Sequence, residues 1–194
     1  RRTGVLGTVM LTFDDGPDPD YTGRLLDLLK EEEVKAAFFV VTREAVKEEA
    51  LIDRMLSEGH VVGFHSMDHQ NAMVRGYLHT RKDFRTGSEF MKRKGISDIW
   101  YRPPWGLTNL FSWHFVRKYG MKMVLWDVMA EDWERGATAG SIRKKCLSRV
   151  KDGSILCLHD GGRRTGGAPG APEKTLEALT YVIPALKEAG YRFI

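Results

Sequence analysis

The stretch that decides the fold reads Val9-Met10-Leu11-Thr12-Phe13-Asp14-Asp15-Gly16-Pro17. Its first part is an apolar run typical of a buried strand, and its last part is a turn that begins with two adjacent acids. Neighbouring side chains of a strand point to opposite faces, but a turn at Gly16 can break this alternation and let both carboxylates face one site. Two adjacent ionised carboxylates repel each other, so the stretch predicts a cation close by.

The bulk composition is that of a globular protein. The chain has 194 residues, a formal net charge of +4, and 42% hydrophobic and 29% charged residues. This length predicts a single domain over residues 1–194 with a sizeable core. Two cysteines provide no disulfide framework, and no stretch is apolar enough to span a bilayer. Lys and Arg are scattered along the chain, which argues against a nucleic-acid partner.

Strand-like and helix-like segments alternate along the chain. The strand patterns fall at 8–13, 36–41, 61–64, 99–101, 122–126, 154–158 and 191–194. The helical patterns fall near 20–33, 44–58, 76–94, 109–119, 138–150 and 173–189. Such alternation predicts parallel strands covered by helices. An eight-unit barrel usually needs about 250 residues. This shorter α/β chain therefore predicts a distorted, incomplete (β/α) barrel of about seven parallel strands.

Five of the predicted strands end in ionisable residues. These are Asp14 with Asp15, His65, Arg102, Asp127, and His159 with Asp160. In a parallel barrel the strand ends share one face, where active sites are built. The Gly-, Arg- and Pro-rich segment 161–172 predicts a surface loop at the rim. Three arginines of the rim loops either meet an anionic polymer or merely solvate the loops: Arg135, Arg163 and Arg164.

His65 and His69 predict a metal site together with one of the two acids. They are four residues apart, so on a helical turn they would share a face. Zinc takes His nitrogens and carboxylate oxygens, and three protein ligands leave the open position of a catalytic site. Cobalt, nickel and iron suit the same ligands. If Asp15 binds the metal, Asp14 is free to take a proton from water that the metal has activated.

The other strand ends supply candidates for the remaining chemistry. His159 is the natural general acid because histidine titrates near neutral pH. Asp132 could hold His159 charged and oriented, or it could cap a helix. Arg102 could pair with Asp14 and favour its ionised form, or it could form a structural salt bridge.

Two tryptophans adjoin these residues in the sequence. Trp105 follows Pro104, and Trp133 follows Asp132. Tryptophans beside a polar site suggest walls on which a sugar ring stacks, although Trp is also a common core residue. Either interpretation fits Trp105. Trp133 directly follows Asp132, and this position favours a role as a wall for the sugar ring.

Five motifs, in order, resemble those of the NodB-homology polysaccharide deacetylases, carbohydrate esterase family 4. They are Thr12-Phe13-Asp14-Asp15-Gly16, His65-Ser66-Met67-Asp68-His69, Arg102-Pro103-Pro104-Trp105-Gly106, Asp132-Trp133 and Leu158-His159-Asp160. The resemblance spans residues 8–194. It implies a distorted (β/α) barrel that removes N-acetyl groups from N-acetylglucosamine-containing polysaccharide such as peptidoglycan or chitin-like oligomers. It also implies an extracellular or cell-envelope location, with any leader or anchor outside these residues.

The resemblance implies a role for each motif residue. It implies a metal, usually zinc, held by Asp15, His65 and His69. Asp14 would be the base and His159 the acid that protonates the departing amine, tuned by Arg102 and Asp132 respectively.

The same resemblance implies the contacts to the acetyl group. The backbone N–H of Trp105 would help the metal to stabilise the oxyanion. The family's fifth motif usually has Leu two residues before its His, whereas this chain has Cys157 followed by Leu158. Cys157 and Leu158 are therefore expected at the acyl pocket.

Two other functions stay open at this stage. The same residues could hydrolyse O-acetyl esters, as on xylan, since an ester leaving group needs less protonation than an amine. A non-catalytic sugar-binding module on the same scaffold is the other alternative. Such modules tend to lose a ligand or the base, and this chain keeps all of them.

Overall fold

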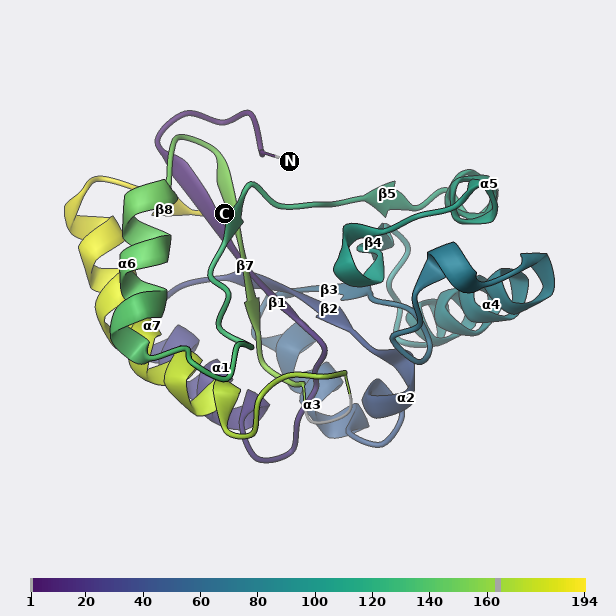
Figure 1. Ribbon diagram of the computed structural model, residues 1–194, viewed down its shortest axis with the longest axis horizontal. Helices are drawn as coiled ribbons and strands as arrows, with labels where there is room; N and C mark the ends of the chain where they lie inside the picture. The colour runs from purple at the N-terminus through teal and green to yellow at the C-terminus, as the bar shows by residue number, and fades with distance from the viewer. Residues whose placement is uncertain (1, 163–164) are drawn as a thin grey trace.

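The fold is built on one sheet of parallel strands (Figure 1). The computed structural model describes residues 2–162 and 165–194. Within them the strands are β1 Thr8–Asp14, β2 Ala36–Val40, β3 Val61–Phe64, β4 Trp100–Tyr101, β5 Lys122–Met123, β6 Val128–Met129, β7 Ser154–His159 and β8 Arg192–Phe193. Their order is β5-β4-β3-β2-β1-β7-β6, and β8 pairs with the start of β1. All of these pairings are parallel.

The sheet is an incomplete barrel with helices on its outside. β5 and β6 are its edges, and in the described ranges they do not pair with each other. This confirms the predicted distorted barrel of about seven parallel strands. The helices are α1 Thr22–Glu31, α2 Thr42–Ala45, α3 Glu49–Ser57, η1 Ala72–Val74, α4 Tyr77–Arg93, η2 Pro104–Gly106, α5 Leu110–Lys118, α6 Ala139–Arg149 and α7 Ala171–Glu188. None of them, over the described residues, has the length and apolar character to cross a membrane.

Local sequence explains where two of the helices begin. Asn109 and Thr138 precede α5 and α6, and each side chain accepts a hydrogen bond from the backbone N–H of a serine three residues later, Ser112 or Ser141. The serine hydroxyl in turn bonds the N–H of the capping residue. These are capping boxes, which satisfy backbone donors that a helix start leaves unpaired.

The strands separate an apolar core from a partly polar interior. One face of β1 packs toward the helices and buries Val9, Leu11 and Phe13. Met10 points to the inside of the half-barrel, where it belongs to a small apolar cluster with Phe39. Because side chains alternate along a strand, Thr12 and Asp14 share this inner face. The interior therefore changes from apolar to polar toward the carboxyl ends of the strands.

Two predicted elements differ from the structure, and one strand was not predicted. The range 44–58 contains the end of α2 and all of α3, with a turn between them. The strand predicted over 122–126 stops at Met123, because Val124 and Trp126 turn into the half-barrel and pack on its inner apolar cluster. The chain then forms β6, which the sequence pattern did not predict.

Candidate active site

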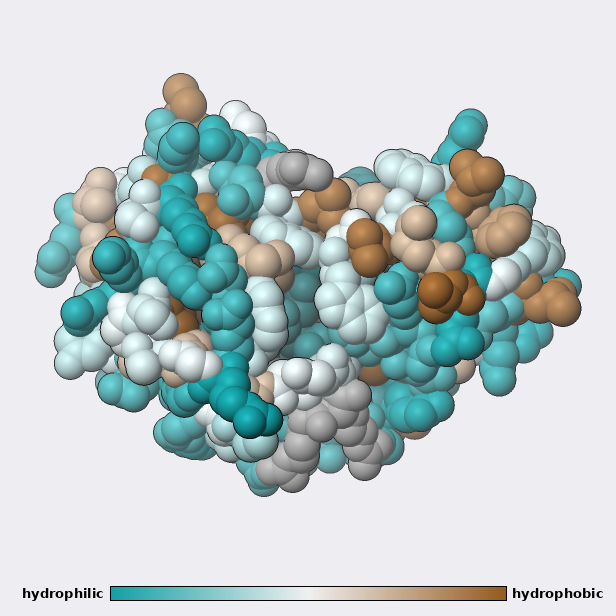
Figure 2. Space-filling model, in the orientation of Figure 1, coloured by the Kyte–Doolittle hydropathy of each residue, from teal (hydrophilic) through white to brown (hydrophobic). Residues whose placement is uncertain are grey.

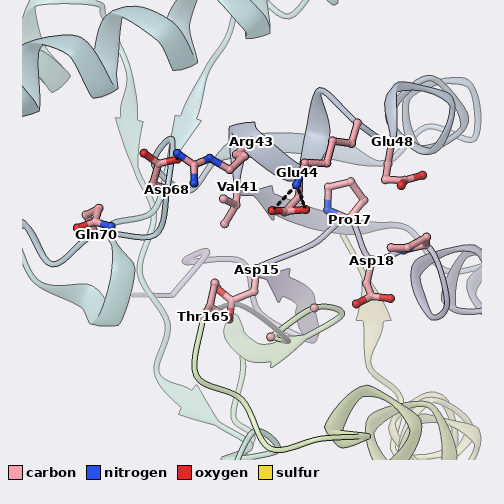
Figure 3. A pocket seen from close by; sticks show the side chains of 14 residues that line it. Asp15, Pro17, Asp18, Val41, Arg43, Glu44, Glu48, Asp68, Gln70 and Thr165 are labelled. Carbon is pink, nitrogen blue, oxygen red and sulfur yellow. Dashed lines mark hydrogen bonds and ion pairs between the residues drawn. The ribbon is translucent and has the colours of Figure 1, made fainter.

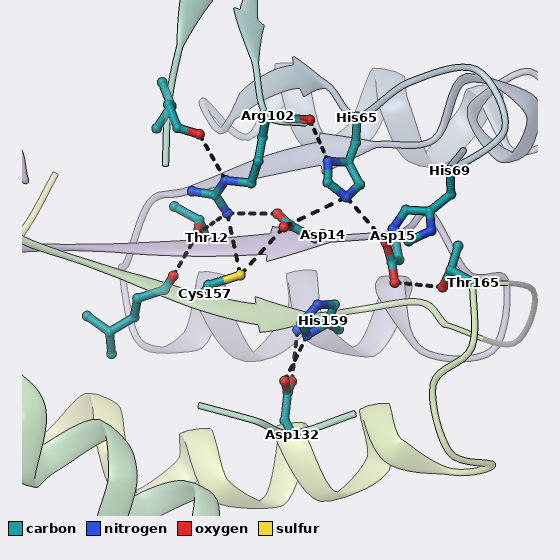
Figure 4. Close-up of polar contacts among 12 residues, drawn as sticks. Thr12, Asp14, Asp15, His65, His69, Arg102, Asp132, Cys157, His159 and Thr165 are labelled. Carbon is teal, nitrogen blue, oxygen red and sulfur yellow. Dashed lines mark hydrogen bonds and ion pairs between the residues drawn. The ribbon is translucent and has the colours of Figure 1, made fainter. Parts of the chain in front are cut away.

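Side chains from four strand ends converge on one cleft (Figure 4). Asp14 ends β1, His65 follows β3, Arg102 follows β4 and His159 ends β7. In the register of the sheet, Asp14 is paired with His159 on the neighbouring strand. The structure thus brings these four predicted site residues together.

The turn after β1 sets the positions of the two acids. Asp15 has a left-handed backbone with φ of 78°, so its carboxylate departs from the alternation of the strand. Gly16 follows it, and a Cβ there would clash with the carboxylate of the buried Asp160. Asp14 and Asp15 are both buried and both line the cleft.

Asp15, His65 and His69 form a cluster that could hold a metal ion. Nε2 of His65 and Nε2 of His69 lie 3.5 and 3.2 Å from Oδ1 of Asp15. That oxygen is buried and lacks a hydrogen-bond partner among the described residues, so a cation would satisfy it. Nδ1 of His65 donates to the carbonyl oxygen of Arg102 at 2.7 Å, which leaves Nε2 available to a metal ion. The Thr165 hydroxyl donates to the other oxygen of Asp15 at 2.6 Å.

The two histidines lie in a loop, not on the helical turn that their spacing suggested. Ser66 and His69 have left-handed φ values of 67° and 51°, and the rings of His65 and His69 come to 5.2 Å between centroids. Asp83 of α4 accepts the backbone N–H of Met67 and so braces this loop. Burial lowers the pKa of His69 to about 4, so its ring is neutral near neutral pH, as a metal ligand must be.

Asp14 is held by a buried arginine. Nη1 of Arg102 donates to Oδ1 of Asp14 and to Oγ1 of Thr12, both at 2.7 Å. Arg102 is completely buried, with its guanidinium 4.0 Å from the centroid of the Phe39 ring. The other oxygen of Asp14 accepts a hydrogen bond from the Cys157 thiol at 3.5 Å. Burial and the charge of Asp14 raise the pKa of this thiol well above its usual value, so it stays protonated.

His159 is held by Asp132. Oδ1 of Asp132 accepts from Nδ1 of His159 at 2.8 Å, and its Oδ2 accepts from the His159 backbone N–H at 2.8 Å and the Thr175 hydroxyl at 2.7 Å. Burial alone would lower the pKa of His159, but the charge of Asp132 and its hydrogen bond raise that pKa to about 9. The ring is therefore protonated near neutral pH, and Nε2 points away from Asp132.

Aromatic side chains wall the cleft, whose volume is about 420 Å³. Trp105 is 54% exposed and has a left-handed φ of 54°, and its ring centroid lies 4.3 Å from that of His69. Trp133 packs edge-on to His159 at 5.0 Å. The sequence did not single out three further lining residues, Trp126, Met129 and Thr165. Trp126 ends the apolar run 122–126, which has the composition of a strand, so the sequence did not indicate that its side chain turns into the cleft.

Two sequence predictions need correction. Leu158 does not line the cleft, because the alternation of β7 turns it into the core behind the sheet while Cys157 faces the cleft. Asp127 also lies away from the cleft. Its Oδ1 accepts the backbone N–H of Ile155 near the start of β7, and its Oδ2 accepts from Nε of Arg2, both at 2.8 Å.

A second, polar cleft of about 400 Å³ opens on the other side of Asp15 and Thr165 (Figure 3). On its wall Nη2 of Arg43 meets Oδ1 of Asp68 at 2.7 Å. Because Asp15 and Thr165 line both clefts, the two clefts adjoin each other. Two predicted rim contacts lie outside the described residues, Arg163 and Arg164.

Fold and site together define a class of protein. At the carboxyl ends of an open parallel half-barrel lie three side chains that could hold a metal ion, an arginine-held carboxylate and a carboxylate-held histidine. This arrangement is typical of a hydrolytic active site and differs from a closed structural metal centre. Residues 2–124 match the model of the family described as polysaccharide deacetylase. The chain belongs to the polysaccharide deacetylase family, as its motifs predicted.

Similar proteins carry related activities. The chain is 32% identical over 188 residues to a peptidoglycan-N-acetylglucosamine deacetylase of Bacillus cereus, covering 96% of this chain and 84% of that protein. It is 30% identical over 198 residues to a chitooligosaccharide deacetylase of Azorhizobium caulinodans, covering 98% and 93%. It also matches the solved structure of a family 4 acetyl xylan esterase from Clostridium thermocellum in complex with a cobalt ion. That match has a TM-score of 0.85 and 34% identity, and covers 96% of this chain and 87% of the esterase.

Proposed function

We propose that this protein is a metal-dependent hydrolase that removes N-acetyl groups from N-acetylglucosamine-containing polysaccharide, either peptidoglycan or chitin-like oligomers. The observation that carries the proposal is the unpartnered Oδ1 of Asp15 between two histidines, beside a second carboxylate, Asp14, that Arg102 holds. One acid is available to a metal and the other to proton transfer. Relatives named as deacetylases of such glycans support the substrate class.

In this proposal the metal is held by Asp15, His65 and His69. One carboxylate oxygen and two imidazole nitrogens suit zinc best, and also cobalt, nickel or iron. The cobalt ion in the Clostridium thermocellum esterase is compatible with such a site. A divalent cation here would supply Lewis-acid chemistry, polarising the acetyl carbonyl and activating water. The backbone N–H of Trp105 would donate to the developing oxyanion.

Asp14 and His159 carry the protons. Asp14 takes a proton from the attacking water, and its orientation is fixed by Arg102 on one oxygen and the Cys157 thiol on the other. His159 gives a proton to the departing nitrogen, which is a poor leaving group unless it is protonated. Asp132 keeps His159 protonated and aimed for this step.

The clefts accommodate the polymer. Trp105 and Trp133 are the walls on which the reacting sugar packs, and Cys157 lines the pocket for the acetyl methyl group. The polar cleft beyond Asp15 receives a neighbouring sugar through hydrogen bonds. Because these polymers lie outside the cytoplasm, we place the protein in the extracellular space or at the cell envelope.

The test is acetate release by zinc-loaded protein from N-acetylglucosamine oligomers. Asp14→Asn should lower the rate by roughly 10²–10⁴-fold, the usual contribution of a general base, and leave the zinc content unchanged. A chelator should abolish release, and re-addition of zinc should restore it. Asp98→Asn is the matched control, since Asp98 is exposed on the surface, where it pairs with Lys122 at 2.6 Å. Full activity in Asp14→Asn would remove Asp14 from the role of base.

A second candidate function is O-acetyl ester hydrolysis on a polysaccharide such as xylan, favoured by the 34% identity to an acetyl xylan esterase. An alcohol leaves more readily than an amine, so an ester depends less on the acid. His159→Ala should then reduce hydrolysis of acetylated xylan much less than hydrolysis of N-acetyl oligomers. Equal, complete loss on both substrates would speak against the esterase.

A further inference from the structure

Exposed apolar side chains gather at one end of the molecule. Figure 2 shows them in brown at the right, over the helices that Figure 1 labels α4 and α5. Five exposed hydrophobic residues of η1, α4 and α5, between 51% and 84% exposed, are Met73, Val74, Leu78, Leu110 and Trp113. These five residues are called here the α4–α5 patch. A cluster of this kind is unfavourable in water and indicates an interaction surface.

The three helices that carry the patch are held against one another. The Nδ2 of Asn109, ahead of α5, donates to the carbonyl oxygens of Ala72 and Arg75 at 2.6 and 3.0 Å, which ties η1 to α5. The ring of Tyr77, at the start of α4, packs on that of Phe111 in α5 with centroids 5.7 Å apart. The exposed apolar residues of η1, α4 and α5 are therefore neighbours.

Basic side chains continue the exposed face of α5. Spacings of three and four residues place Leu110, Trp113 and Arg117 on the same side of the helix, and Lys118 follows His114 by four residues. These four residues, with His114, line one shallow surface depression. The helix is apolar at the start of this face and basic at its end, and it contains no acidic residue.

The exposed face of α4 is basic as well. After Leu78 come three exposed basic residues, Arg81, Lys82 and Arg85. Of the two acids in this helix, Glu89 lies 3.9 Å from Arg85. The other, Asp83, is turned inward onto the backbone N–H of Met67, and burial raises its pKa to about 7. The apolar patch is therefore flanked by an excess of positive charge.

We propose that the α4–α5 patch docks this protein onto the surface of an anionic lipid bilayer. Apolar side chains with Trp and flanking Lys and Arg are the composition of an interfacial surface, where the apolar groups enter the headgroup boundary and the cations meet lipid phosphates. A helix of nine residues is too short to span, so α5 lies on the membrane.

Two other occupants fit less well. A second copy of the chain would bring like charges face to face, which disfavours association. A glycan binds to flat aromatic faces and hydrogen-bonding groups, whereas the most exposed members of the patch are aliphatic, with Leu110 at 84% and Leu78 at 75%.

Docking in this way would bring the cleft to the membrane surface. Trp105, which walls the cleft, lies in η2, a few residues ahead of α5. The protein would then act on glycan close to the bilayer. The docking itself does not depend on the proposed chemistry and can be tested without any substrate.

The experiment is sedimentation of the chain with vesicles of phosphatidylcholine, alone or with about 30% phosphatidylglycerol. Binding to the anionic vesicles should be at least about tenfold stronger, and should weaken about tenfold between roughly 0.1 and 0.5 M salt because the Debye length shortens. Leu110→Ser with Trp113→Ser should weaken it about tenfold or more, and so should Arg117→Glu with Lys118→Glu.

Matched controls change equivalent residues elsewhere. Leu6→Ser removes a leucine that is 78% exposed ahead of β1. Arg143→Glu with Lys144→Glu makes the same charge change on α6, at the opposite end of the molecule in Figure 1. Both controls should bind vesicles as the parent chain does. All variants should keep the parent's unfolding midpoint and its activity on a soluble oligomer.

Several results would overturn the proposal. Equal binding to neutral and anionic vesicles, or none to either, would do so. Equal loss in the α6 charge control would show a general effect of net charge and no docking face. A dimer in light scattering that Leu110→Ser with Trp113→Ser dissociates would make the patch an interface between copies.

Discussion

Asp132→Asn tests whether a buried charge keeps His159 ready to act as the acid. The substitution preserves the size of the side chain and removes its charge. Asp132 is completely buried and bonds both Nδ1 and the backbone N–H of His159. With that charge in place the pKa of His159 is about 9, although burial works against it. Without that charge, burial is the largest influence and is opposed by the charges of Asp15 and Asp14, so the pKa should fall to about the ordinary 6.5 or below.

The expected effect on the rate follows from this change in pKa. A fall of two or more pKa units corresponds to roughly 3 kcal/mol of lost stabilisation of the protonated ring. At about pH 7.5 the protonated fraction drops from nearly complete to below roughly one tenth, so the rate on an N-acetyl substrate should drop at least about tenfold. Because a general acid works in its protonated form, wild-type activity should decline as pH rises through about 9. In the variant the decline should move below neutral pH.

The assay is kcat/KM for acetate release over roughly pH 5 to 10. Thr175→Val is the matched control, because it removes the hydroxyl that donates to Asp132 at 2.7 Å and keeps the charge. In this control, kcat/KM should decline at high pH over nearly the same range as in the wild type. A basic limb that is unchanged in Asp132→Asn would refute the argument that Asp132 maintains the protonated acid.

Arg102→Met should lower the free energy of unfolding by roughly 3–5 kcal/mol, because it leaves the buried charge of Asp14 uncompensated. Urea unfolding measures this, and a loss under about 1 kcal/mol would contradict it. Burial raises the pKa of Asp160 to about 7, so the folded protein keeps a proton that the unfolded chain releases, and stability should fall as pH rises from about 4 to 7. Thermal midpoints should show a smaller fall in Asp160→Asn. Burial raises the pKa of both thiols. It raises the pKa of Cys146 to about 12, and it raises the pKa of Cys157 well above the usual value for a thiol. Both thiols should resist Ellman's reagent in the folded protein and react in urea, and fast labelling of native protein would count against their burial.

The parts of the fold and site that the sequence predicted rest on short-range rules. Apolar runs alternate with helical patterns, and this alternation dictates parallel strands whose carboxyl ends share an edge. Asp14, His65, Arg102 and His159 each follow an apolar run directly, so placing the strands also placed these residues. The motif order then identified the family without any knowledge of side-chain geometry.

The parts that the sequence missed depend on where the chain leaves regular structure. The run ending at Trp126 has strand composition, but the sheet stops at Met123 because the next apolar residues fill the half-barrel. Asp127 was predicted at the site because it follows the strand expected over 122–126. The strand ends earlier, and Asp127 lies away from the site. Thr165 reaches Asp15 only through the path of a long loop, and no local pattern encodes that path.

Arg102 serves two neighbours through different parts of itself. Its carbonyl oxygen fixes His65, and its guanidinium holds Asp14. Mutation can erase the guanidinium but not the carbonyl, because every residue carries one. In the proposed chemistry, a substitution of Arg102 would impair proton transfer by Asp14 but leave metal binding and glycan binding in place. The rest of the fold would have to compensate for the lost stability. One substitution at position 102 could therefore convert the proposed enzyme into a non-catalytic glycan-binding protein with the same fold.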